Sequence, residues 1–178
     1  MKRRTVLAVL ASSVAILGCA PEPAPPPKPA EKPGPLPKKA DRVLVLKGAR
    51  KLFLMAGDRT IKTYTVSLGR VPVGHKEREG DGKTPEGTYT LDYRNPDSQY
   101  YRSIHISYPA AADRERARKL GVSPGGEIMI HGLPNGKGWI GPDHAQYDWT
   151  EGCIAVTNEE MDEIWAMVAD GTQIEIRP

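Results

Sequence analysis

Alternation of apolar and polar residues dominates the chain from residue 42 onward and predicts a series of short β-strands. The second and third of these strands are separated by a short turn containing Gly57, which favours a hairpin. Strands spaced so closely predict a mainly β domain, either a sandwich or a partly closed barrel. The runs with this pattern cover residues 42–47, 51–55, 61–67, 88–93, 103–108, 127–131 and 172–177.

Two other segments have helical patterns. Residues 113–120 are strongly charged and are followed by Gly121, a residue common at helix C-termini. In residues 158–168 we expect Asn158 to be the N-cap. One apolar face of this helix would consist of Met161, Ile164, Trp165 and Val168. The sequence therefore predicts a mainly β fold with one or two short helices.

The N-terminal region differs from the rest of the chain. Basic residues at positions 2–4 precede an apolar run of 12 residues from Val6 to Leu17, which is typical of a secretory signal and too short to span a bilayer. The run ends at Gly18-Cys19 and resembles a bacterial lipobox, which implies cleavage before Cys19 and a lipid on its thiol. The alternatives are a signal peptide cut nearby or an uncleaved anchor.

Residues 20–40 are rich in Pro, Ala and Lys and predict an extended spacer. We therefore expect a signal peptide in 1–18, a lipidated Cys19 and tether in 19–41, and one domain in 42–178. The expected location is the periplasmic side of the cell envelope, with the lipid in the outer membrane because Ala20 follows the cysteine.

Charge is divided unevenly between these regions. The whole chain carries 25 basic and 22 acidic residues, but seven of the basic and only three of the acidic ones lie in residues 1–41. The predicted domain therefore has a net charge of −1. Such a domain lacks the basic surface that nucleic acid requires, so we exclude that class of partner.

Cys153 is the strongest candidate for chemistry. If Cys19 is lipidated, Cys153 is the one thiol left in an exported protein, and it has no partner for an internal disulfide. It is then either a buried, inert cysteine or a reactive one. Gly152 immediately before it would allow a substrate or another backbone to approach closely.

His131 is the candidate base, because it ends an apolar strand and precedes Gly132 and a loop rich in Gly and Pro. An imidazole beside a thiol can deprotonate it and later protonate a leaving amine. We expect His105 to be structural and His75 to be solvated, and we keep His144 as a second candidate. His131, His144 and Cys153 could also bind zinc, but their spacings match no compact metal signature, so we expect no metal or other cofactor.

Taken together, several motifs resemble the L,D-transpeptidase catalytic (YkuD-type) family over residues 42–178. They are His131-Gly132, Ile140-Gly141, residues 150–155 (Thr-Glu-Gly-Cys-Ile-Ala), Val66-Ser-Leu-Gly69 and residues 82–89. The resemblance implies a peptidoglycan enzyme of cell wall biogenesis and cell shape. Its nucleophile would be Cys153 and its base His131, with the Gly132 carbonyl orienting the imidazole and the N–H groups of Gly152 and Cys153 stabilising the oxyanion.

The same resemblance implies attack on the third residue of a tetrapeptide stem, release of D-Ala, and transfer of the acyl group to an amine. Thr150, Glu151, His144 and Trp149 are candidate substrate-binding residues. The chain departs from the family pattern at Glu151, where His is common, and at Ala155, where Arg is common; Lys137 or Arg102 could replace that cation. The alternatives are an L,D-carboxypeptidase or amidase, which transfers to water, and a wall-binding lipoprotein without activity.

Overall fold

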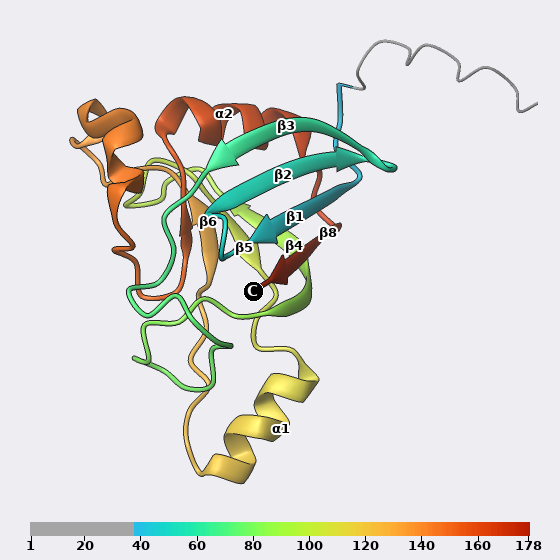
Figure 1. The fold of residues 1–178 in the computed structure, drawn as a ribbon, viewed down its shortest axis with the longest axis vertical. Coiled ribbons are helices and arrows are strands. Elements are labelled where there is room, and N and C mark those ends of the chain that lie inside the picture. Colours follow the sequence, from blue (N-terminus) through green and yellow to red (C-terminus); the bar gives the residue numbers. More distant parts are fainter. Residues whose placement is uncertain (1–37) are drawn as a thin grey trace, which may run out of the picture. The chain divides into compact units, whose positions relative to one another are not determined.

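The computed structural model describes residues 38–178, which form one curled, eight-stranded sheet with three short helical segments (Figure 1). The predicted signal peptide and most of the predicted tether therefore lie outside the described residues. The strands are β1 (Arg42–Leu46), β2 (Lys51–Ala56), β3 (Arg59–Thr65), β4 (Gly87–Asn95), β5 (Ser103–Ile106), β6 (Met129–His131), β7 (Ile154–Ala155) and β8 (Thr172–Arg177). The helical segments are α1 (Ala111–Leu120), the 3-10 segment η1 (Gly138–Gln146) and α2 (Asn158–Met167).

The strand order is β3-β2-β1-β8-β4-β5-β6-β7, so the C-terminal strand lies in the middle of the sheet. β8 runs parallel to β1 and antiparallel to β4, and β6 and β7 form the second parallel pair. The sheet curls into a half-barrel, which confirms the mainly β fold and selects the partly closed barrel over the sandwich. Among residues 38–178, no helix is long and apolar enough to cross a membrane.

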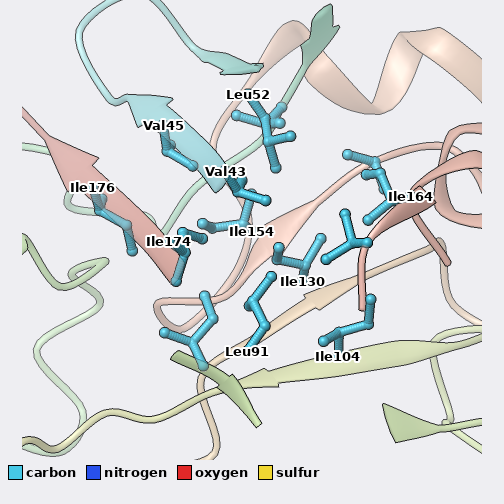
Figure 2. Close-up of a cluster of buried hydrophobic side chains, with 14 of the residues drawn as sticks. Val43, Val45, Leu52, Leu91, Ile104, Ile130, Ile154, Ile164, Ile174 and Ile176 are labelled. Carbon is cyan, nitrogen blue, oxygen red and sulfur yellow. The ribbon is translucent and has the colours of Figure 1, made fainter. Parts of the chain in front are cut away.

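The core lies on the concave side of the sheet and is built from alternate residues of the strands. Val43, Leu91, Ile130, Ile154 and Ile174 point into one cluster from five different strands (Figure 2). Burying aliphatic side chains of this size stabilises the fold by about 1.5–3 kcal/mol each. α2 covers this cluster with its apolar face, as its sequence pattern predicts.

The predicted N-cap of α2 was wrong by one residue. Thr157 is the cap: its hydroxyl accepts from the N–H of Glu160 at 3.2 Å, and the Glu160 carboxylate accepts from the N–H of Thr157 at 2.9 Å. Asn158 instead uses its side-chain oxygen to accept from the N–H of Leu133 at 2.9 Å. This contact connects the start of α2 to the segment that follows β6. No pattern in the sequence indicates η1, and we expected these residues to be part of a loop.

The long connection between β3 and β4 lies against the segment that contains Cys153. It contacts that segment through two isolated bridges, Ser67 with Ala155 and Gly69 with Thr150. The buried ammonium of Lys47 fixes this connection through the carbonyls of Gly74 and Thr84 and the carboxylate of Glu86, at 2.6–2.8 Å.

A second buried ion pair lies within the same connection. The side chains of Lys76 and Asp81 are both buried, and Nζ of Lys76 lies 2.9 Å from Oδ1 of Asp81. Burial alone would raise the pKa of Asp81, but hydrogen bonds from Lys76 and from three backbone N–H groups lower it to about 2. Buried charged groups therefore hold the connection between β3 and β4, which lies outside the hydrogen-bonded strands of the sheet.

Candidate active site

His131 and Cys153 lie on the same face of the sheet, at its short-stranded end. β6 and β7 pair in parallel with Ile130 opposite Ile154 and His131 opposite Ala155. Side chains alternate along a strand, so Cys153, two residues before Ala155, faces the same side as His131. The two isoleucines point the other way, into the core. The two residues that the sequence singled out are thus brought together.

Both side chains line one open cavity of about 770 Å³. Its other walls come from the segment between β4 and β5, from the residues around β6, and from the residues before Cys153. The remaining lining residues are Asn95, Asp97, Ser98, Gln99, Tyr100, Ser103, Glu127, Met129, Trp149, Thr150 and Glu151. Most of the lining residues have polar side chains, which suits a substrate with peptide groups.

The thiol of Cys153 is held against the start of β6. Its Sγ accepts from the N–H of Met129 at 3.4 Å and lies 3.5 Å from the carbonyl oxygen of Glu127. Burial raises the pKa of Cys153, and the Met129 N–H offsets this only in part. The sulfur is therefore a neutral thiol at pH 7 and needs a base to become a nucleophile.

His131, which lines the same cavity, has the protonation state that such a base needs. Burial lowers its pKa to about 4, so the imidazole is neutral at pH 7. Its Nδ1 lies 2.7 Å from the carbonyl oxygen of Gly132. Because a carbonyl can only accept, Nδ1 must carry the proton and Nε2 must hold the free lone pair. The family resemblance implies the same role for the Gly132 carbonyl.

Two aromatic rings flank the His131 imidazole. Tyr100 lies 4.6 Å from it and Trp149 lies 5.7 Å from it, measured between ring centroids. Trp149 was a sequence candidate, and the structure places it on the base as well as in the cavity. Tyr100 was missed, because it lies in an irregular segment where no period indicates which side chains face inward.

Gly152 and Thr150 shape the turn before the thiol. Gly152 has φ +133°, and a Cβ there would be 2.6 Å from the carbonyl oxygen of Lys83. Only glycine fits this position. The hydroxyl of Thr150 donates to the Cys153 carbonyl at 2.7 Å and accepts from the Gly152 N–H at 3.1 Å. The predicted oxyanion donor at Gly152 is therefore occupied by Thr150 in this structure.

Glu151 forms an ion pair with Arg70 at the mouth of the cavity, and both side chains are more than half exposed. Sequence reasoning missed Arg70. Ala155, at the position where the family commonly has an arginine, is buried in β7. Of the two suggested replacements, Arg102 pairs with Asp162 at 3.0 Å, away from the cavity. Lys137 lines a separate small cavity beside Trp149.

The other histidines lie outside the cavity of Cys153. His144 is buried, and its Nδ1 lies 3.2 Å from the Ser67 hydroxyl. His105 contacts Asp92, in agreement with a structural role. The expectation that His75 is solvated was wrong: its Nε2 lies 3.0 Å from the buried carboxylate of Asp113, because the connection between β3 and β4 folds onto α1. Within residues 38–178, no three His, Cys, Asp or Glu residues are grouped so that they could hold a metal ion.

Comparison with known proteins identifies the family. The model of the L,D-transpeptidase catalytic domain (YkuD) matches residues 40–176, and the chain belongs to that family. It is 37% identical over 121 residues to the Escherichia coli K12 protein named "Putative L,D-transpeptidase YafK", covering 66% of this chain and 42% of YafK.

Solved structures agree with the fold. The helical cell shape determining protein Pgp2 from Campylobacter jejuni is 28% identical with a TM-score of 0.57, over 75% of this chain and 46% of Pgp2. An L,D-transpeptidase from Xylanimonas cellulosilytica shares the fold at 17% identity, with a TM-score of 0.52 over 82% of this chain and 64% of that one. The chain spans less than half the length of YafK or Pgp2.

Proposed function

We propose that the domain is a cysteine acyltransferase that acts on the stem peptides of peptidoglycan. The observation that carries this proposal is that Cys153 and a neutral His131 line the same cavity. The family gives the substrate class, and the resemblance to its motifs gives the scissile bond, which follows the third residue of a tetrapeptide stem.

In the first half of the reaction, His131 Nε2 takes the proton of the Cys153 thiol, and the sulfur attacks the carbonyl carbon of the stem's third residue. The backbone N–H of Cys153 stabilises the oxyanion. The N–H of Gly152 donates to the oxyanion as well, once its hydrogen bond to the Thr150 hydroxyl has broken. The C–N bond then breaks as the imidazolium gives its proton to the amine of D-Ala. The product is a thioester on Cys153.

In the second half, the acceptor attacks the thioester while His131 takes a proton from the acceptor. The C–S bond then breaks, and the imidazolium returns the proton to the Cys153 sulfur, which regenerates the thiol. An amine acceptor from another stem gives a cross-link, which makes the enzyme an L,D-transpeptidase. Water gives a tripeptide, which makes it an L,D-carboxypeptidase. The same chemistry on a different amide would make it an amidase.

The test is to incubate the purified protein with tetrapeptide muropeptides and to weigh the products by mass spectrometry. Cross-linked dimers support the transpeptidase, and tripeptide monomers support the carboxypeptidase. Cys153→Ala should abolish both, and Cys153→Ser should lower them by at least about 10³-fold because a hydroxyl is a poorer nucleophile here. Unchanged turnover in Cys153→Ala would overturn the proposal.

We also propose that Cys19 anchors the domain to the outer membrane on its periplasmic side and that the protein contributes to cell shape. The lipobox and the Pro-rich spacer support the anchor, and the similarity to Pgp2 supports the role in shape. Mass spectrometry of the purified protein should find a diacylglycerol on Cys19. Cys19→Ala should move the protein out of the membrane fraction, and retention there would contradict the anchor.

A further inference from the structure

The segment between β4 and β5 contains a strained residue next to the candidate base. Tyr101 has φ +67°, in the left-handed region, which is strained for a residue with a bulky side chain. Such a conformation persists only where the surroundings hold it. The residue before it, Tyr100, is the one whose ring lies 4.6 Å from the His131 imidazole.

This turn contacts the base in a second way, through Gly132. A Cβ at Gly132 would lie 3.0 Å from the Cβ of Tyr101 and 3.3 Å from the carbonyl oxygen of Tyr100. The turn therefore packs closely on the residue whose carbonyl orients His131. Any shift of the turn would therefore move the Tyr100 ring that lies on the imidazole. It would also move the Gly132 carbonyl to which the imidazole donates.

Two side chains hold Tyr101 in place from outside the cavity. Its N–H donates to the side-chain oxygen of Asn135 at 3.0 Å, and its hydroxyl donates to the carboxylate of Asp162 at 2.8 Å. Asp162 lies on α2, and its Oδ1 forms an ion pair with Nη1 of Arg102 at 3.0 Å. That guanidinium also lies over the Tyr101 ring, 5.5 Å from its centroid.

We propose that Asp162 is a positioning residue for His131. It holds Tyr101 in the left-handed conformation, and this in turn keeps the Tyr100 ring over the imidazole. Asp162 touches neither the base nor the cavity. The assignment of a catalytic role to His131 rests on the proposed function, but the contacts that link Asp162 to its ring do not.

The next residue of α2 provides a matched control. Glu163 accepts from the hydroxyl of Tyr64 at 2.9 Å and pairs with Lys62 at 2.9 Å. Its side chain is 45% exposed, against 46% for Asp162. Both carboxylates thus bind one tyrosine hydroxyl and one cation from the same helix, but the Glu163 group leads to β3 and not to His131.

The experiment compares Asp162→Ala, Tyr101→Phe and Glu163→Ala in two measurements. The first follows the ring protons of His131 by NMR as the pH is changed, with His131→Gln to assign the signal. In Asp162→Ala and Tyr101→Phe, the pKa of His131 should rise from about 4 towards 6.5, because the loosened turn exposes the ring to water. Glu163→Ala should leave it unchanged.

The second measurement is turnover of tetrapeptide muropeptides. We expect kcat to fall about tenfold in Asp162→Ala with KM within about twofold, because the base is misplaced while the substrate contacts remain. The acid limb of the pH profile should move to higher pH. Asp162→Asn keeps an oxygen that accepts from the Tyr101 hydroxyl, so it should restore most of the activity.

If Asp162→Ala and Tyr101→Phe both match Glu163→Ala in the NMR titration, the positioning role is wrong. A general loss of stability cannot imitate the expected result, because it would not move the His131 pKa in the folded protein. If the wild type fails to turn over stem peptides, the proposed function is wrong, while the NMR measurement still decides the role of Asp162.

Discussion

The two ends of the sheet are built in different ways. The end formed by β3, β2, β1 and β8 has strands of five to seven residues; burial alternates along β1 and β8, and an irregularity at Leu54/Met55 interrupts the pairing of β2 with β3. The end formed by β5, β6 and β7 has strands of four, three and two residues, and it carries the candidate active site. Both ends bury one face in the same apolar core, but at the second end the opposite face carries the site and depends on single contacts from loops.

This difference predicts that the two ends contribute differently to stability and to turnover. A short strand fixes few side chains through its ladder, so the orientation of His131 depends on the Gly132 carbonyl and on two aromatic rings. Changes at the long-stranded end should therefore lower stability and leave turnover per folded molecule intact. Changes to the side chains that line the cavity at the short-stranded end should instead lower turnover and leave stability largely intact.

The largest expected effect is that of His131→Gln. Loss of the general base should lower turnover of stem peptides by about 10³-fold, which is about 4 kcal/mol of transition-state stabilisation. The free energy of unfolding at pH 7 should change much less, because glutamine can still donate to the Gly132 carbonyl. His105→Gln is the control: His105 lies on β5, at the same end of the sheet but outside the cavity, so this variant should retain turnover. An equal loss there would show that the effect of His131→Gln is not specific to the cavity.

Leu52→Ala tests the other end. Leu52 on β2 is fully buried, and its truncation should lower the free energy of unfolding by about 3 kcal/mol in a urea titration. Turnover per folded molecule should be unchanged. Thr63→Ala, at an exposed position of β3, should cost less than about 0.5 kcal/mol. A loss of turnover in folded Leu52→Ala would show that the two ends are coupled.

The same difference explains what could be predicted from the sequence. The strands of the long end follow from their alternation, and the buried face of α2 follows from its helical period. Cys153 and His131 could be found because their neighbouring residues form recognisable motifs. Ile130 and Ile154 mark the core face of β6 and β7, which places the nucleophile and the base on the other face.

The rest of the site could not be predicted, because it depends on contacts between segments far apart in the chain. Tyr100 reaches His131 only through a strained turn, and Arg70 reaches Glu151 across 81 positions. The N-cap of α2 was misplaced because Asn158 binds a distant backbone group, leaving Thr157 as the cap. No local pattern carries such information.

Stability should also depend on pH through His131. In the unfolded chain its pKa is near 6.5, and in the folded protein burial lowers it to about 4. Between these values the unfolded state binds the proton and the folded state does not, so stability falls as the pH falls from 6.5 to 4 and levels off below. The loss should be about 2–3 kcal/mol and should be absent in His131→Gln. Equal pH dependence in both proteins would show that the imidazole is not buried.

The smallest effect is expected at the exposed pair of Arg70 and Glu151. Both side chains are more than 60% exposed, so breaking the pair should change the free energy of unfolding by less than about 1 kcal/mol. In Arg70→Ala the carboxylate of Glu151 is left unpaired at the mouth of the cavity, and it should repel the carboxylates of a stem peptide. We expect KM to rise about two- to threefold with kcat unchanged, and the rise should shrink in high salt.

The double variant Arg70→Ala/Glu151→Gln separates charge from shape at this pair. It removes both charges, so KM should return to near the wild-type value if repulsion is the cause. Arg118→Ala breaks a similarly exposed pair with Glu115 on α1, outside the cavity, and should leave KM unchanged. If the double variant keeps the raised KM, Arg70 contacts the substrate itself. Arg70 would then supply the substrate-binding cation that the family commonly has as an arginine at the position of Ala155.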